Sequence, residues 1–248
     1  MPANQVKAFN INAFIQEAKK QLTPSQAEAL AKLENSVSRG DVQDQQIASY
    51  IHIAGFWKDS VRAFEPYAYY ISEAAKLDKS EKNLTFAAQI FLDNLRSEQD
   101  PAKLNWEATE AIALFEKALE LNPGSDDLKI DLASCYVFGK GRVGGTEETM
   151  KGIQMLLGIV RKDSGNMKAQ MVLGIGDYVS GQYDKAVDRL LKVVNTQPDN
   201  FEAIAMLADT YAAKGDKASA LKWYEVVKRM TTNPDYLREV DNRIKQLR

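Results

Sequence analysis

The glycine-rich segment 139–144 has the spacing of a nucleotide-binding turn. Its sequence, GKGRVG, satisfies G-x-G-x-x-G, in which the backbone brings a dinucleotide pyrophosphate to a helix N-terminus. Asp163 follows near the distance expected of an acid that binds the ribose. Such a site also needs parallel strands, whereas the preceding residues 126–138 match the helical pattern of 167–179. We therefore expect 139–145 to be an inserted hairpin loop, or a loop that contacts a partner, rather than a cofactor site.

The other residues with reactive side chains are isolated. A P-loop is excluded because Gly145-Thr146 lacks the lysine that reaches the β- and γ-phosphates. His52 is the single histidine, so a zinc site of common type lacks ligands, and no nucleophile motif accompanies it. Cys135 is the single cysteine, can form no internal disulfide, and is expected to be a small core residue. The sequence therefore predicts no catalytic residue, no cofactor and no metal.

Two acidic pairs, Asp126-Asp127 and Glu147-Glu148, lie where helices are expected to begin. Carboxylates there favour the positive end of the helix dipole, so we interpret them as helix-start residues rather than as an acid/base pair. Aromatic residues at helical spacing are expected to belong to the core, with a small-molecule site as the alternative. They are Phe56, Trp57, Phe64, Tyr67, Tyr69 and Tyr70.

Composition excludes several classes of protein. The 248 residues include 32 basic and 34 acidic side chains, so no basic field exists to collect the phosphates of a nucleic acid or an anionic membrane. No secretory signal is recognisable at 1–10, and the longest nearly uncharged apolar stretch, 47–57, is too short to span a bilayer. We expect no membrane insertion, and a place in the bacterial cytoplasm or, if an anchor precedes residue 1, at a membrane.

The sequence repeats itself at a spacing of 34 residues. With this shift Leu173 falls on Leu207 and Ala186 on Ala220, and an earlier unit matches at a shift of 41. The difference of 7 corresponds to the glycine-rich insertion. Because small residues meet small residues and large apolar residues meet large apolar residues, the chain is built of similar units.

Each unit is predicted to consist of two helices. Over 183–197, apolar residues recur at the spacing of one helix face, with Gly181 before the helix and Pro198 after it. Gly174 on the first helix and Ala186 on the second would let the two backbones approach closely. A hairpin this short cannot cover its own apolar faces, so it must stack on its neighbours.

Four segments follow one another along the chain. Residues 1–40 are expected to be helical without a repeat, with Thr23 as the N-cap of a helix that begins at Pro24. Residues 41–105 are expected to form divergent hairpins, with helices at 41–57 and 59–76. An array with the insertion follows over 106–234, and then a capping helix over 235–248, whose apolar face is formed by Leu237, Val240, Ile244 and Leu247.

Three segments resemble tetratricopeptide repeats: EATEAIALFEKALELNPGS, YDKAVDRLLKVVNTQPDN and DKASALKWYEVVKRMTTNPD. Leu173-Gly174 and Tyr178 match the large, small and aromatic residues of the family's first helix, and Ala186 and Pro198 match its second. Leu190 and Val193 replace the usual aromatic residue and alanine. The resemblance covers 106–234, is weaker over 41–105, and extends to bacterial members of the family.

The resemblance implies an all-α solenoid of antiparallel hairpins that forms a right-handed superhelix and binds a protein or peptide. In this family the first helices line a concave groove. The corresponding residues here are Ile130, Ser134, Val137, Lys168, Met171, Ile175, Tyr178, Glu202, Ala205, Asp209 and Ala212. The lysine and asparagines with which chaperone-binding relatives hold a carboxylate are replaced. The apolar residues on 167–179 favour an amphipathic helix or apolar peptide, and Asp209 and Glu202 favour a basic flank.

Three hypotheses of function therefore stand. The favoured one is a non-enzymatic binding module or scaffold. The second keeps the repeats but makes them structural, with self-association into a homo-dimer through residues 1–60. The third is an enzyme that binds a nucleotide at 139–146.

Overall fold

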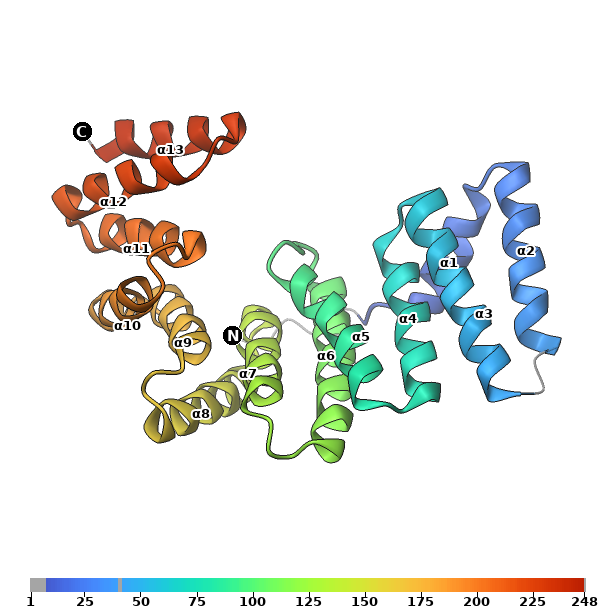
Figure 1. Cartoon of the computed structure of the whole chain (residues 1–248). Coiled ribbons are helices and arrows are strands. Elements are labelled where there is room, and N and C mark those ends of the chain that lie inside the picture. The colour runs from blue at the N-terminus through green and yellow to red at the C-terminus, as the bar shows by residue number, and fades with distance from the viewer. Residues whose placement is uncertain (1–7, 40–41, 248) are drawn as a thin grey trace. The chain divides into compact units, whose positions relative to one another are not determined.

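The computed structural model describes residues 8–39 and 42–247, and all regular structure in these ranges is helical. The chain divides into two compact units, Met1–Gly152 and Ile153–Arg248. Figure 1 shows both as series of antiparallel helices joined by short connections. The division falls inside α8 (Thr146–Lys162), within the array predicted for 106–234.

In the first unit the helices pair in the order of the sequence. α3 packs on α4, α5 on α6, and α4 also packs on α5, which stacks the two hairpins (Figure 1). The helices are α1 (Ile11–Lys20), α2 (Pro24–Arg39), α3 (Gln43–Gly55), α4 (Phe64–Asp78), α5 (Glu81–Leu95), α6 (Pro101–Leu121) and α7 (Asp126–Ser134). The predicted helix at 59–76 is thus displaced, and the predicted boundary at 105 falls inside α6.

Side-chain caps fix where several of these helices begin. The Thr23 backbone N–H donates to Gln26 Oε1 at 3.0 Å, and the Gln26 N–H donates to Thr23 Oγ1 at 3.3 Å. This reciprocal capping box confirms the predicted start at Pro24. Asp126-Asp127 and Glu147-Glu148 lie in the first turns of α7 and α8, as predicted from the helix dipole.

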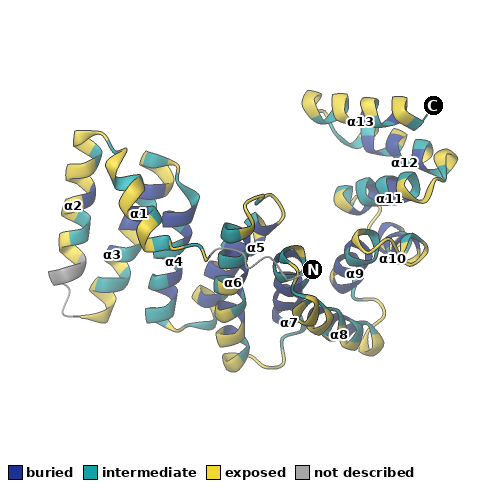
Figure 2. Ribbon diagram, turned by 180° about the vertical axis from the view of Figure 1, so that it is seen from behind, coloured by how far each residue is buried: buried dark blue, intermediate teal, exposed yellow. Residues whose placement is uncertain are grey.

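The core of the first unit is made of large side chains between the paired helices. Figure 2 shows buried residues on the sides by which neighbouring helices face each other. Phe91, Leu95, Leu114 and Phe115 are completely buried between α5 and α6. Five of the six predicted aromatic residues belong to the core: Phe56 and Trp57 are buried with Ile15, Leu30 and Ile53, and Tyr67, Tyr69 and Tyr70 pack against them. The sixth, Phe64, is half-buried.

One carboxyl group lies inside this core. Glu107 of α6 is completely buried, and its Oε1 and Oε2 accept hydrogen bonds from Asn94 Nδ2 at 3.0 and 3.1 Å. Burial in a low-dielectric environment raises the pKa of Glu107 to about 8. Glu107 is therefore predominantly neutral at pH 7.

The glycine-rich segment differs from the predicted loop. α7 continues as a π-helical turn, η2 (Cys135–Lys140), and a short 3₁₀ turn, η3 (Gly141–Val143), follows it. Gly139 is buried against α6, where an added Cβ would lie 2.4 Å from the Cβ of Ala108. The insertion is therefore largely absorbed by a longer first helix, because a glycine at this position permits close contact with α6.

In the second unit α9 packs on α10 and α11 on α12, and α10 packs on α11. The helices are α9 (Met167–Val179), α10 (Tyr183–Thr196), α11 (Phe201–Lys214), α12 (Lys217–Met230) and α13 (Pro234–Leu247). A Cβ added to Gly174 would lie 3.2 Å from Leu190, so the predicted close approach of α9 and α10 is confirmed. Arg189 Nε of α10 donates to Asp177 Oδ2 of α9 at 2.8 Å.

The last helix covers the end of the second unit. α13 packs on α12, with Val240 and Ile244 buried and the flanking Leu237 and Leu247 half-buried. Lys228 Nζ of α12 donates to Asp241 Oδ1 of α13 at 2.6 Å. Residues 234–247 therefore form the capping helix that the apolar pattern predicted.

Candidate functional site

The three inner-face residues predicted in the first unit are largely buried. Ile130 is 0% and Ser134 4% exposed, and Ser134 Oγ donates to the Ile130 carbonyl oxygen at 2.8 Å. Val137 lies half-buried in η2. Ile130 and Ser134 therefore offer almost no surface to a partner.

The predicted residues of α9 differ in exposure along the helix. Met171 and Ile175 are only 8% and 7% exposed, whereas Tyr178 is half-buried and Lys168 is exposed. The ring of Tyr178 lies 6.0 Å from that of Tyr183, centroid to centroid. Burial is the main reason why the pKa of Tyr178 is raised. On α9, contact with a partner would therefore fall mainly on Lys168 and Tyr178.

One of the predicted residues of α11, Asp209, accepts hydrogen bonds from other side chains of the protein. Glu202 is exposed, and Ala205, Asp209 and Ala212 are half-buried. Asp209 Oδ1 accepts a hydrogen bond from Tyr224 Oη at 2.6 Å and another from Arg243 Nη1. Because Arg243 of α13 already balances its charge, Asp209 attracts a basic partner less than the sequence suggested.

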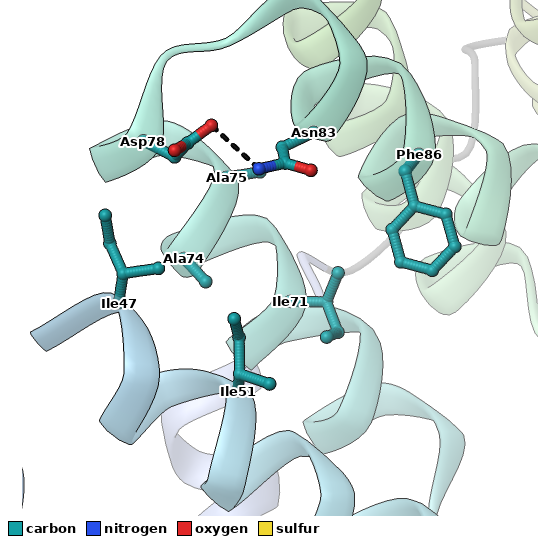
Figure 3. A pocket seen from close by; sticks show the side chains of 8 residues that line it. All are labelled: Ile47, Ile51, Ile71, Ala74, Ala75, Asp78, Asn83 and Phe86. Atoms are coloured by element: carbon teal, nitrogen blue, oxygen red, sulfur yellow. Dashed lines mark hydrogen bonds between the residues drawn. The ribbon is translucent and has the colours of Figure 1, made fainter. Parts of the chain in front are cut away.

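A cavity in the first unit was not predicted as a site. It lies between α3, α4 and α5 and has a volume of about 160 Å³. Figure 3 shows the side chains around it, which are Ile47, Ile51, Ile71, Ala74, Ala75, Asp78, Asn83 and Phe86. Ala74 and Ala75 are buried, whereas Ile51 and Phe86 are 48% and 56% exposed. The cavity is therefore an open, mostly apolar hollow that includes residues of the first helices of two successive hairpins.

Asp78 is the single ionisable residue around this cavity. Its Oδ2 accepts hydrogen bonds from Asn83 Nδ2 at 2.8 Å, from the Ser80 N–H at 3.1 Å and from Ser80 Oγ, and Figure 3 shows the first of these. The hydrogen bonds from Ser80 and Asn83 lower the pKa of Asp78 below its ordinary value. Its Oδ1 accepts no hydrogen bond from the described part of the chain, so a charged acceptor stands at the cavity.

A signal for this cavity was present in the sequence. The buried residues of α5 follow one stripe, which includes Leu84, Ala88 and Phe91, and Phe86 lies off that stripe. In α3, Ile51 likewise lies off the stripe that contains the buried Ile53. A large apolar residue outside a complete core stripe indicates an interaction surface, because folding alone does not bury it.

The single cysteine and the single histidine of the chain differ in exposure. Cys135 is completely buried, and burial raises the pKa of its thiol far above the ordinary value, which leaves it unreactive. His52 is exposed on α3. Among the described residues, no group of three or more His, Cys, Asp or Glu side chains is arranged to hold a metal ion.

The basic residues of the glycine-rich segment form hydrogen bonds with α5, α6 and the connection between them. Lys140 Nζ donates to Asn105 Oδ1 at 2.8 Å and to Thr109 Oγ1 at 2.5 Å. Arg142 Nη2 donates to the Glu98 carbonyl oxygen at 2.8 Å, and Nη1 donates to that of Leu95. The segment that precedes them is helix α7 rather than a strand, so the context of a dinucleotide site is missing.

The fold defines an all-α array of stacked antiparallel hairpins. A family model described as tetratricopeptide repeat matches residues 107–140 and 180–238, so the chain carries tetratricopeptide repeats, as the resemblance implied. No match is found among curated proteins. Proteins with these repeats are generally scaffolds for protein interactions. No helix in the described ranges has the length and apolar character needed to cross a membrane.

Two solved structures support the fold. One is TTC0263, a thermophilic protein of this repeat class from Thermus thermophilus, with a TM-score of 0.58 and 14% sequence identity over 81% of this chain and 98% of that chain. The other is PilW, described as a widely conserved type IV pilus biogenesis factor. Its TM-score is 0.53 and its identity 19%, over 81% of this chain and 88% of that chain.

Proposed function

We propose that this protein is a non-enzymatic module that binds a peptide or helix of a partner protein on the first helices of its hairpins. The observation that carries the proposal is the uncovered apolar surface of Ile51 on α3 and Phe86 on α5, beside the cavity of the first unit. Burial of apolar surface is worth about 25 cal/mol per Å², so these side chains gain from a covering partner. Contiguous exposed apolar surface is typical of interaction sites.

The second unit offers a different surface for the same purpose. Lys168, Tyr178 and Glu202 are exposed or half-buried on α9 and α11. Lys168 and Glu202 already have interactions within the protein. A partner would therefore compete with these interactions for the two charged side chains. An aromatic ring with a polar tip, such as Tyr178, is favoured at interfaces because it combines apolar area with a hydrogen-bonding group.

Affinity capture from the native cell tests this function. The wild-type chain is compared with Ile51→Asp, Tyr178→Ala and, as a control, Met150→Asp. Met150 and Ile51 are both 48% exposed, so the control introduces the same charge at a surface position that is not part of the cavity. Captured proteins are then purified, and their affinity for each variant is measured by calorimetry.

We expect at least one captured protein to bind the wild type and the Met150→Asp variant equally. Its affinity should fall at least tenfold with Ile51→Asp or Tyr178→Ala, because an apolar contact is lost and, at Ile51, a charge is left in its place. Equal affinity for all four chains would contradict binding on the first helices.

A further inference from the structure

The cavity between α3, α4 and α5 combines an apolar lining with a polar edge. Six of its eight residues are isoleucine, alanine or phenylalanine, and the other two are Asp78 and Asn83. In Figure 3 Ile47, Ile51 and Ile71 lie around the hollow, with Asp78 and Asn83 together at one side. A ligand would therefore meet apolar contacts in the cavity and a hydrogen-bonding group at its edge.

The size of the cavity selects a small apolar group. Sites for drug-sized ligands have volumes of roughly 300–1,000 Å³. This cavity measures about 160 Å³. An apolar cavity of about 150 Å³ is known to hold benzene. The hollow is thus matched to one ring-sized or branched side chain.

The charge at the edge selects what accompanies that side chain. Asp78 donates no hydrogen bond as a carboxylate, and its Oδ1 is open to a donor from outside the described residues. Lys79, the next residue, lies around a separate cavity with Lys76 and Lys117, so its ammonium does not line this one. A cation is favoured beside Asp78, whereas an anion, including an anionic lipid headgroup, is disfavoured.

We propose, on the basis of the protein-binding function above, that this cavity takes one phenylalanine or leucine side chain of a partner segment. A lysine or arginine one or two residues away on that segment donates to Asp78 Oδ1. The apolar side chain supplies most of the affinity, because it covers Ile51 and Phe86. The ion pair forms at an exposed edge, where water screens it strongly, so it adds little affinity. Its contribution is selectivity for a basic residue.

Selection of peptides from a random phage-displayed library on the full chain tests the proposal. We expect enrichment of peptides with phenylalanine or leucine next to a basic residue. The best peptide is then synthesised with a fluorophore, and its dissociation constant is measured by anisotropy for the wild type, Ile51→Asp, Asp78→Asn and Met150→Asp. A second peptide has its basic residue replaced by norleucine.

Ile51→Asp should weaken binding at least tenfold, and Met150→Asp should leave it unchanged. Asp78→Asn should weaken the basic peptide by about two- to fivefold, the range of an exposed ion pair, and should not weaken the norleucine peptide. This difference should shrink in 1 M salt. Equal effects of Asp78→Asn on both peptides, or selected peptides without a basic residue, would overturn the assignment of Asp78.

Two further results would separate the proposal from the function on which it depends. If selected peptides bind but are insensitive to Ile51→Asp and are lost with Tyr178→Ala, the module binds peptides elsewhere and the cavity proposal fails alone. If no peptide binds, both fail. If the wild type is a dimer by sedimentation and Ile51→Asp is a monomer, a second copy covers the cavity, which also overturns the proposed occupant.

Discussion

The buried carboxyl group of Glu107 makes the stability of the first unit depend on pH. Its pKa is about 8 in the folded protein, mainly because of burial, and the negative charges of Glu98 and Glu65 contribute. In the unfolded chain the pKa is the ordinary 4.5. The folded state therefore holds a proton that the unfolded state releases between these two values, so stability falls as pH rises through this range.

The magnitude follows from the two pKa values. Each pH unit within the range costs about 1.4 kcal/mol. Integration of the linkage relation between pH 5 and pH 8, with pKa values of 4.5 and about 8, gives a loss of about 3.5 kcal/mol from this one group. Glu107→Gln keeps the shape and retains an oxygen that accepts from Asn94 but cannot ionise, so this loss should be absent in the variant.

Urea unfolding monitored by tryptophan fluorescence measures the difference. Trp57 and Trp106 lie in the first unit and Trp223 in the second, so the experiment is done in a Trp223→Phe background. Titrating groups that do not interact with Glu107 contribute equally to both proteins. The free energy of unfolding of Glu107→Gln minus that of the parent should therefore rise by about 3.5 kcal/mol from pH 5 to pH 8. Glu120→Gln, a substitution at the far end of α6 from Glu107, is the control.

A constant difference between Glu107→Gln and its parent across this pH range would refute the reasoning. It would mean that Glu107 titrates with the same pKa in the folded and unfolded chains. A difference that rises equally for Glu120→Gln would refute the assignment to Glu107, because a carboxylate that is not fully buried loses less solvation on folding.

Three further perturbations test other parts of the structure. Arg243→Ala should lower the free energy of unfolding of the second unit by about 1–2 kcal/mol, because Asp209 loses a charged donor. The fluorescence of Trp223 measures this unfolding. Removal of the exposed Lys214, which pairs with Asp184, should have no detectable effect. Gly139→Ala should cost about 1–3 kcal/mol by overpacking against α6, while Gly158→Ala, with no atom within 4 Å of the added Cβ, should be neutral or raise the melting temperature. Millimolar NAD or ATP should leave the melting temperature unchanged, because the basic residues of 139–144 are bound within the protein.

Much of the fold can be predicted from the repeat pattern of the sequence. The helix over 183–197 and the capping helix over 235–248 were predicted within a few residues, because their apolar stripes and flanking Gly181 and Pro198 are strong local signals. The close approach at Gly174 was also predicted correctly. These features depend on contacts within a hairpin, which the sequence of that hairpin specifies.

Features that depend on contacts between helices were harder to predict. The sequence around Gly139 resembles a loop, and only the tight contact with Ala108 explains why it continues as helix. From their place in the repeat, Ile130 and Met171 were predicted to line a partner-binding groove, yet tertiary packing buries both side chains. Asp209 was expected to face a partner, but its interaction with Arg243, 34 residues later, is visible only in the structure.

The interaction of α13 with Asp209 limits how this array could change its length. Tyr224 and Arg243 already donate to Asp209, and Val240 and Ile244 are already buried, so a further hairpin packed against α13 could use none of these groups. A hairpin duplicated ahead of Pro234 would keep α13 as the last helix, provided that it repeats the contacts of α11 and α12. Engineered growth of the second unit by internal duplication would therefore preserve these contacts of α13.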